Sequence, residues 1–386
     1  MIERIAAKEL INLAAQYKAV AVTGPRQSWK TTLVKLVFKH KPYVSLENPD
    51  TRMFALEDPR GFLATYPDGA ILDEVQRVPA LFSYLQQVLD ERNEPGYFIL
   101  TGSNNFLLQE NIAQSLAGRI AHLNLLPFSL SEVGAGQDSN PDEFIFKGMY
   151  PPLYDQPFDI NKWYGNYIQT YIEKDVRQIK NINNLVVFER FVKLCAGRVG
   201  QLLNMHSLAI EAGLDHKTIA SWLSILESSF ILFRLQPHHV NFNKRLVKMP
   251  KLYFYDTGLT AALLGITQQS QLPQHPLRGA LFENFIITEL LKSRLNKGLP
   301  NNLYFWRDNT GHEIDVIEER NGHLFPIEIK SGKTITNDYF KGLDFWYKIS
   351  GQKEGAVIYG GNQPQKRSDG FEVFSWNNIG GLKVEG

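Results

Sequence analysis

In the first third of the chain, short apolar runs alternate with longer amphipathic stretches. The runs at 19–24, 70–73 and 97–100 are almost continuously hydrophobic, and polar residues follow each of them at once. Continuous apolar strands are typical of a parallel sheet with helices on both faces, because neither face of such a strand meets water. The alternation of strand and helix therefore predicts an α/β fold with a largely parallel sheet in this part of the chain.

The pattern changes twice farther along. Residues 134–144 are rich in Gly, Asp, Asn and Pro, which marks a loop and a domain edge. The following segments carry apolar residues at helical spacing, and strand-like runs return from Asn301 onward. With 386 residues at roughly 150 residues per domain, we expect an α/β core over 1–140, a helical region over 141–267 and an α/β domain over 268–386.

Composition and charge exclude several classes of protein without selecting a function. The chain is 44% hydrophobic and 21% charged, as in folded globular proteins, and its net charge is +1. Nucleic-acid affinity would therefore need a local basic patch. The single cysteine, Cys195, excludes an internal disulfide. Charges near the N-terminus do not match a signal peptide, and no run approaches the roughly 18 apolar residues of a membrane span. We expect a cytoplasmic protein with no membrane partner.

A phosphate-binding loop is predicted between the first strand and the helix that follows it. The segment GPRQSWKT runs from Gly24 to Lys30 and Thr31, and in such a loop the backbone N–H groups and the helix N-terminus bind phosphate. The lysine of this motif reaches the β- and γ-phosphates, and the threonine ligates Mg²⁺. Ser28 and Thr32 complete the expected ATP-binding set.

One position of this loop departs from the motif GxxxxGK[ST]. Trp29 stands where the motif has glycine, whose conformational freedom lets the backbone approach phosphate closely. An indole there would crowd the phosphates or the loop itself, so we expect weak nucleotide binding. The alternative is a strand-loop-helix that matches the motif by chance and binds no nucleotide.

Two further strands end in side chains that would complete an ATPase site. The second apolar strand ends in Asp73 and Glu74; the first would hold the Mg²⁺ shell and the second would polarise the attacking water. The third strand leads to Ser103 and Asn104, small polar residues suited to contact the γ-phosphate or the lytic water. Each group alone is also compatible with an ordinary strand end or turn. Their order after the loop favours the nucleotide site.

Four motifs in sequence support a family resemblance. GPRQSxKTT, LDEVQ, ILTGSNN and SLAGR, in that order, resemble the AAA+ ATPases of bacteria and archaea that pair a P-loop NTPase core with a C-terminal DUF4143 domain. Residues 208–259 also resemble that domain. The resemblance covers nearly the whole chain and implies ATP and Mg²⁺ as cofactors. Arg119, in the last motif, would serve as a finger on the nucleotide of a neighbouring copy in a homo-oligomer, or only be solvated at the surface.

The helical middle contains a helix-turn-helix pattern. Gly213 marks the turn, and Asp215 is placed as the N-cap of the second helix. In a DNA reader that helix would present His216 and Lys217 to the major groove; the alternative is a winged-helix scaffold that packs other domains. A basic stretch from Asn243 to Lys251 would contact a nucleic-acid backbone or be solvated.

The C-terminal region carries acids and a lysine in a suggestive order. Glu283 lies in an apolar helix, Asp315 in a strand, and Glu328 and Lys330 on one face of the next strand. This arrangement resembles the restriction-endonuclease-like PD-(D/E)XK superfamily. The resemblance implies that the three acids bind Mg²⁺ and that Lys330 assists the attacking water. The alternatives are a structural ion-pair cluster and an inactive relic of that fold.

The motifs in the sequence are compatible with two classes of function. The first is an ATP-driven enzyme that acts on DNA or RNA through a nuclease-like C-terminal domain. The second is a nucleotide-responsive regulatory or binding module with a degenerate ATPase and no cleavage activity, and Trp29 favours it.

Overall fold

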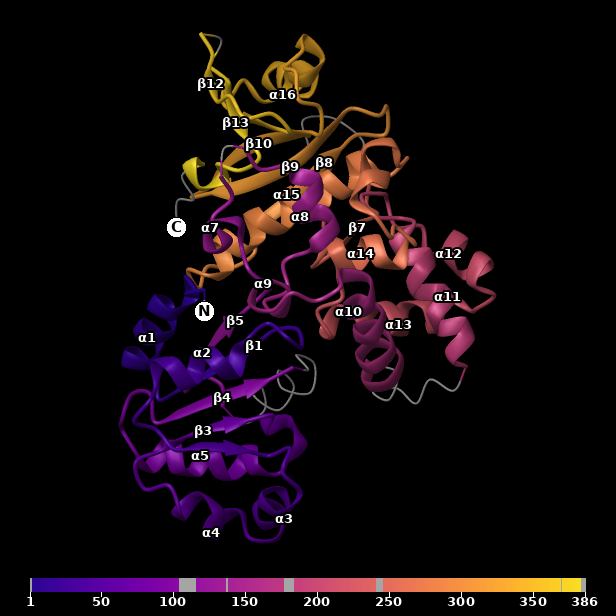
Figure 1. Ribbon diagram of the computed structural model, residues 1–386. Coiled ribbons are helices and arrows are strands. Elements are labelled where there is room, and N and C mark those ends of the chain that lie inside the picture. The colour runs from indigo at the N-terminus through magenta and orange to yellow at the C-terminus, as the bar shows by residue number, and fades with distance from the viewer. Residues whose placement is uncertain are drawn as a thin grey trace. The chain divides into compact units, whose positions relative to one another are not determined.

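The computed structural model describes residues 2–103, 116–136, 138–176, 184–240, 246–368 and 370–382. The chain divides into two compact units (Figure 1). Unit 1 comprises residues 1–128 with the short segments 228–230 and 295–299, and unit 2 comprises the rest. The predicted edge near residue 140 thus falls inside unit 2, which contains both the helical middle and the C-terminal sheet. The further division of unit 2 near residue 268 stays a prediction.

Unit 1 is built on a five-stranded parallel sheet, as the apolar runs predicted. Its strands are β1 (Ala19–Thr23), β2 (Tyr43–Ser45), β3 (Ala70–Asp73), β4 (Phe98–Gly102) and β5 (Ile120–Asn124), in the order β2-β3-β4-β1-β5. The central strand β1 pairs in parallel with both β4 and β5. The residues of β1, β3 and β4 are buried throughout. This burial explains why their sequences are continuously apolar.

Helices cover both faces of this sheet. Val20 and Val22 of β1 pack in one core with α1 (Ala6–Gln16) and α2 (Lys30–Val37). The alternate residues Ala19 and Ala21 pack in a second core. That core includes side chains of α3 (Pro49–Glu57), α4 (Pro59–Ala64) and α5 (Leu81–Glu91). The two-residue period of a strand thus sends neighbouring side chains into different cores.

Unit 2 begins with helices, as predicted. They are α7 (Leu130–Val133), α8 (Pro141–Lys147), α9 (Pro152–Asp155), α10 (Ile160–Tyr167), a π-helical segment (Ile168–Val176), α11 (Leu185–Ala196), α12 (Met205–Ala212), α13 (His216–Ser228), α14 (Thr257–Leu263) and α15 (Arg278–Leu295). A two-stranded antiparallel sheet of β6 (Leu232–Leu235) and β7 (Lys251–Phe254) interrupts them. The sequence did not predict these two four-residue strands, because the apolar residues of this region were interpreted as helical.

The helix-turn-helix pattern is present as local structure. Gly213 adopts a left-handed conformation with φ of 70° between α12 and α13. The Asp215 carboxylate accepts hydrogen bonds from the backbone N–H groups of Lys217 at 2.9 Å and Thr218 at 3.0 Å, as an N-cap does. The two helices and the cap therefore agree with the sequence, while the winged-helix assignment stays a prediction.

The C-terminal part of unit 2 holds a mixed six-stranded sheet. Its strands are β8 (Leu303–Arg307), β9 (Glu313–Arg320), β10 (His323–Lys330), β11 (Ala356–Tyr359), β12 (Gln365–Lys366) and β13 (Glu372–Ser375), in the order β12-β13-β11-β10-β9-β8. Strands β8, β9 and β10 are antiparallel, and β11 pairs in parallel with β10 after the crossover helix α16 (Lys341–Ser350). The strand-like runs predicted from Asn301 onward include β8 through β11. Among the described residues, no helix is both long and apolar enough to cross a membrane.

Candidate functional site

The predicted nucleotide-binding residues gather at the carboxyl edge of the parallel sheet in unit 1. Gly24 follows the last residue of β1, Asp73 ends β3, and Ser103 follows β4. Parallel strands all end at the same edge, so segments that are distant in the chain meet there. This is the edge at which open α/β sheets bind ligands.

The phosphate-binding loop is closed by its own contacts and by a neighbouring arginine. A Cβ atom on Gly24 would lie 2.1 Å from the carbonyl oxygen of Leu125, so only glycine fits. The Ser28 hydroxyl and the Lys30 ammonium donate to the carbonyl of Pro25 at 2.9 and 2.7 Å. From outside the loop, Arg4 donates to the carbonyl of Ser28 at 2.8 Å. The same guanidinium reaches the carbonyl of residue 126 at 2.7 Å. The sequence pattern did not identify Arg4, because it lies before the first helix and outside any motif.

Trp29 adopts the conformation for which the motif reserves glycine. Its backbone is left-handed, with φ of 62° and ψ of 32°, directly before α2. Such a conformation costs a residue with a side chain on the order of 1 kcal/mol or more. The indole packs edge-on against Phe128, with ring centroids 5.4 Å apart. The loop therefore keeps the backbone shape of the motif, and the contact with Phe128 offsets part of the strain.

Asp73 is the centre of the hydrogen-bond network at this edge. Its carboxylate accepts from the Thr31 hydroxyl at 3.1 and 3.2 Å and from the Tyr43 hydroxyl at 2.6 Å. The hydroxyl of Thr101 on β4 also donates to it. Thr31 and Asp73 were predicted as neighbours, whereas Tyr43 and Thr101 were not identified. Burial, followed by the adjacent carboxylate, raises the pKa of Tyr43, so this hydroxyl stays a donor.

Glu74 is held beside Asp73 in a strained conformation. Its backbone is left-handed, with φ of 54° and ψ of 43°. Its carboxylate accepts from the Ser103 hydroxyl at 3.2 Å and from the Gln76 side-chain amide. The structure thus brings together Glu74 and Ser103, as the sequence predicted. Asn104, the other residue of that prediction, lies outside the described residues.

Burial lowers the pKa of Lys30 to about 8. The negative charges of Glu74 and then Asp73 act in the opposite direction, and Arg26 adds to the lowering. Water is excluded from the ammonium because the loop closes over it. A buried, weakly compensated cation is disposed to take an anionic partner.

Arg119 does not reach this site within its own chain. It directly precedes β5, so it lies at the opposite, amino edge of the sheet. The five residues of β5 separate the two edges, a span of about 16 Å. The guanidinium pairs with Asp90 of α5, with Nη2 to Oδ2 at 3.0 Å. A role toward a neighbouring copy stays a prediction.

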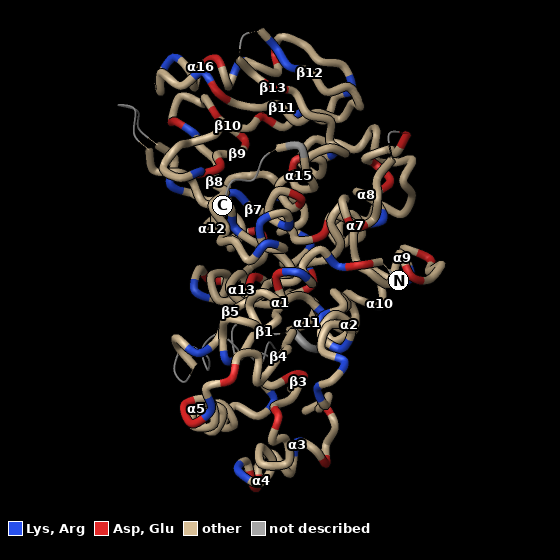
Figure 2. Tube along the Cα trace, turned by 90° about the vertical axis from the view of Figure 1, so that its left-hand side faces the viewer, with Lys and Arg blue, Asp and Glu red and all other residues tan. Residues whose placement is uncertain are grey.

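A second cluster lies in unit 2, where acidic and basic positions are interspersed along β7, β9 and β10 (Figure 2). The Lys330 ammonium contacts Asp315 at 3.1 Å and also contacts Glu328. The backbone N–H of Ile329 donates to Asp315 at 2.8 Å. Burial and the charge of Asp315 raise the pKa of Glu328 well above its usual value. Oε1 of Glu328 is buried and has no hydrogen-bond partner among the described residues.

Glu283 belongs to the adjoining half of this cluster. Its carboxylate accepts from the Lys251 ammonium at 3.0 Å and from the Tyr253 hydroxyl. Lys251 also pairs with Glu313. Within the described ranges, no group of three or more His, Cys, Asp or Glu side chains is arranged to hold a metal ion. The four predicted residues are therefore neighbours, but lysines stand between the carboxylates.

The placement of Lys251 corrects the interpretation of the basic stretch. The sequence predicts an exposed Lys251, either on a nucleic-acid backbone or in solvent, yet its side chain is only 4% exposed. It is the first residue of β7, and the strand directs it into the core of unit 2. Residues 243–245 of the same stretch lie outside the described residues.

Three family models match the chain in succession. Residues 16–134 match an AAA domain, residues 139–270 match a domain of unknown function (DUF8612), and residues 278–379 match a domain of unknown function (DUF4143). The AAA and DUF4143 matches confirm the two domains expected from the motifs. The resemblance of residues 208–259 was assigned wrongly, because they fall in the DUF8612 match.

Similar proteins occur in bacteria and archaea. The Uncharacterized protein Rv2008c of Mycobacterium tuberculosis and the Uncharacterized protein Mb2031c of Mycobacterium bovis are each 32% identical over 335 residues, covering 86% of this chain and 74% of theirs. The Uncharacterized protein MJ1544 of Methanocaldococcus jannaschii is 21% identical over 78% of this chain and 72% of its own.

Solved structures give weaker likenesses. The Walker-type ATPase PABY2304 of Pyrococcus abyssi has a TM-score of 0.43 at 13% identity, covering 67% of this chain and 94% of its own. AMPPCP-bound DnaA from Aquifex aeolicus has a TM-score of 0.30 at 14% identity, covering 58% and 86%. The identity with the two mycobacterial proteins shows that the chain belongs to their family, and its first unit contains an AAA-type P-loop ATPase domain.

Proposed function

We propose that unit 1 binds ATP with Mg²⁺ and hydrolyses it. The observation that carries this proposal is the contact of the Thr31 hydroxyl with the Asp73 carboxylate, at 3.1 and 3.2 Å, beside the buried ammonium of Lys30. Hydroxyl and carboxylate oxygens are the ligands that Mg²⁺ prefers. An ammonium at the start of a helix suits the phosphates. The donor set thus fits both cofactors, and the AAA-domain match supports the same reading.

Further residues have roles in this proposal. Mg²⁺ would neutralise the phosphate charge that develops during hydrolysis. Glu74 orients and polarises the attacking water, and Ser103 and Gln76 hold its carboxylate in place. Asn104 contacts the γ-phosphate or the same water. Arg119 acts only on the nucleotide of a neighbouring copy, because its own site lies at the other edge of the sheet.

A nucleotide-responsive module without turnover is a second candidate function, which Trp29 favours. The left-handed backbone at Trp29 is held by the surrounding loop and by the packing on Phe128. Any rearrangement of the loop around phosphate must move the indole or keep that strain. Slow or absent hydrolysis would then leave ATP as a bound signal.

Action on DNA or RNA rests on the cluster in unit 2. Asp315, Glu328 and Lys330 are in contact, as metal-dependent cleavage by a nuclease-like domain requires. Against this stands the charge balance of the cluster. Lys251 and Lys330 already supply cations to the carboxylates of this cluster. Burial, followed by the charge of Asp315, raises the pKa of Glu328 well above its usual value and makes its charged form less favourable. A metal ion would therefore enter only in exchange for a lysine contact.

ATP affinity should fall as the pH rises through about 8, the pKa of Lys30. Above this value the free protein increasingly holds a neutral amine, so ATP binding requires uptake of a proton. The Kd from calorimetry should rise by up to about tenfold per pH unit. The matched control is Lys30→Arg, whose guanidinium stays charged and should give a flat profile. A flat profile for the native protein would mean that Lys30 does not contact the phosphates.

Trp29→Gly should bind ATP at least about tenfold more tightly, which corresponds to about 1.4 kcal/mol. Glycine adopts the left-handed backbone without a penalty and removes the indole. Trp29→Ala separates these two effects, because it removes the indole and keeps the strained backbone. If both variants bind ATP more tightly, crowding by the indole ring weakens binding in the native protein. If only Trp29→Gly binds more tightly, the strained backbone is the cause. Equal Kd values for all three proteins would refute both explanations.

Glu74→Gln should abolish phosphate release while ATP binding is retained. The amide keeps the shape of the carboxylate but cannot polarise water as an anion does. Release is measured with malachite green, and binding is measured by calorimetry on the same preparation. Asp68→Asn, at an exposed carboxylate of the same unit, is the control and should leave turnover unchanged. Undiminished release in Glu74→Gln would exclude this residue from the mechanism.

Lys251→Met should lower the free energy of unfolding by roughly 3 kcal/mol, because it leaves the buried Glu283 carboxylate without its cation. Chemical denaturation measures the loss, and Lys248→Met, at an exposed lysine, is the control. If Glu283, Asp315 and Glu328 can hold a metal, Mn²⁺ should restore part of the loss.

The same preparations test cleavage. Metal-dependent nicking of DNA or RNA by the native protein should disappear in Lys330→Ala. If Mn²⁺ neither stabilises Lys251→Met nor supports nicking, the cluster is a structural ion-pair network.

A further inference from the structure

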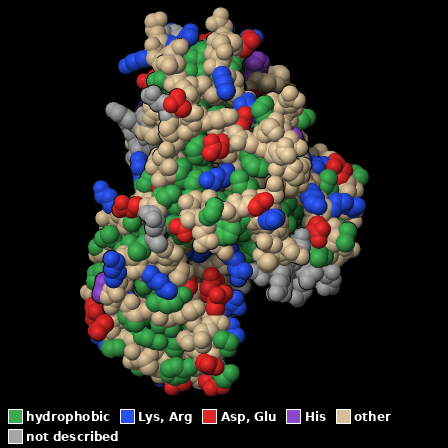
Figure 3. All heavy atoms as spheres, in the orientation of Figure 1, with side chains coloured by type: hydrophobic (Ala, Val, Ile, Leu, Met, Phe, Trp, Pro, Cys, Tyr) green, Lys and Arg blue, Asp and Glu red, His purple; other side chains and the backbone are tan. Residues whose placement is uncertain are grey.

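Helix α3 of unit 1 carries its large apolar side chains on the outside. Within α3, all of whose residues the structure describes, Ala55 is the one buried side chain. Met53, Phe54 and Leu56 are 55%, 41% and 52% exposed. In Figure 3, hydrophobic side chains stand beside acidic ones at the foot of the view, where α3 and α4 lie. A surface helix normally buries such residues, and an exposed apolar group of this kind marks an interaction surface.

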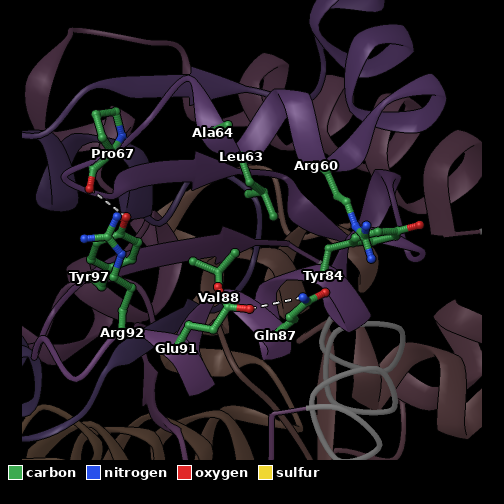
Figure 4. A pocket seen from close by; sticks show the side chains of 10 residues that line it. All are labelled: Arg60, Leu63, Ala64, Pro67, Tyr84, Gln87, Val88, Glu91, Arg92 and Tyr97. Carbon is green, nitrogen blue, oxygen red and sulfur yellow. Dashed lines mark hydrogen bonds between the residues drawn. The ribbon is translucent and has the colours of Figure 1, made fainter.

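A groove of about 370 Å³ lies on the same unit, between α4 and α5 (Figure 4). Its walls are apolar and aromatic, with Leu63 of α4, Val88 of α5 and the rings of Tyr84 and Tyr97. Two guanidinium groups flank it, because Arg60 lies over the ring of Tyr84 and Arg92 over that of Tyr97. Glu91 also lines the groove, and Arg92 pairs with Glu94 at 3.6 Å. The groove thus offers apolar contact with positive charge at Arg60.

Helix α3 and the groove lie on opposite sides of α4. Phe62 of α4 packs on Phe54 of α3, with ring centroids 5.7 Å apart. Arg60 and Leu63 of the same short helix line the groove instead. About one helix width, 8 to 10 Å, therefore separates the apolar ridge from the apolar groove.

The charges of the two features are opposite. The last turn of α3 carries Glu57, and Asp58 follows it directly. An acid at a helix C-terminus is unfavourable, because the helix dipole is negative there. Asp58 already accepts a hydrogen bond from the backbone N–H of Gly61 at 2.9 Å as the cap of α4. The guanidinium of Arg60 in a second copy would offset both the Glu57 carboxylate and the dipole. The acidic end of α3 and Arg60 in the groove thus carry opposite charges.

We propose that this surface joins two copies of the chain. Helix α3 of each copy enters the groove between α4 and α5 of the other, and a two-fold axis passes beside α4. A closed dimer needs a ridge and its matching groove side by side on one surface, so that each contact occurs twice. Helix α3 and the groove between α4 and α5 meet this requirement. None of its residues belongs to the nucleotide site, so the proposal stands independently of ATP hydrolysis.

Leu56→Glu and Arg60→Glu test the two halves of the contact in the full-length protein. Both residues are exposed, so the substitutions should preserve the fold, and unchanged melting temperatures verify this. Sedimentation at about 100 µM, where a dimer with a micromolar Kd is formed, should give a dimer for the native chain and monomers for both variants. Ile210→Glu, at an apolar residue of α12 that is 67% exposed, is the matched control and should remain dimeric.

Mixing the two variants tests the two-fold arrangement. A dimer of one Leu56→Glu chain and one Arg60→Glu chain keeps one intact contact of two, so dimers should reappear in the mixture. Dimers of the native protein, of the Ile210→Glu control and in the mixture, with monomers of Leu56→Glu and Arg60→Glu alone, support the proposal. It is overturned if the native chain is monomeric at this concentration, if either variant dimerises like the native chain, or if the native chain forms assemblies larger than a dimer.

Discussion

The Asp73 carboxylate is the interaction on which the nucleotide site depends. It ends β3 and accepts hydrogen bonds from hydroxyl groups of Thr31, Tyr43 and Thr101. These donors come from the helix after the phosphate-binding loop, from the edge strand β2 and from the neighbouring strand β4. One carboxylate therefore ties the loop to two strands, and it does so where the parallel sheet ends. The loop is held from the other side by Arg4.

Strained backbone conformations occur close to this network. Trp29 and Glu74 both adopt left-handed backbones directly beside the network. Residues with side chains remain in such conformations only where the surroundings hold them. At Trp29 the packing against Phe128 contributes to this, and at Glu74 the contacts to Ser103 and Gln76 do. These local contacts thus help to hold the two left-handed backbones in place.

In unit 2, buried carboxylates are held by ion pairs with lysines. Four carboxylates, of Glu283, Glu313, Asp315 and Glu328, meet around two lysines. Burial makes isolated charges costly, and paired charges reduce that cost. Within this cluster, Oε1 of Glu328 is buried without a hydrogen-bond partner among the described residues. The cluster is therefore an ion network in which carboxylates outnumber lysines, and a metal site there stays a prediction.

The amino-acid sequence by itself determined the parallel sheet, the place of the phosphate-binding loop and the helix-turn-helix cap. These features follow from local periodicity and from short motifs, each of which lies within one short segment of the chain. It also indicated Thr31 with Asp73 and Glu74 with Ser103, because parallel strands must end at one edge. Only the tertiary structure decided the contacts of Arg4, Tyr43 and Lys251. Each of these side chains contacts a residue that is distant in the sequence, and no rule of residue spacing predicts such a contact. Lys251 shows the reason most clearly: in the sequence it is one of several basic residues near Lys248, and β-pairing alone directs it into the core among carboxylates.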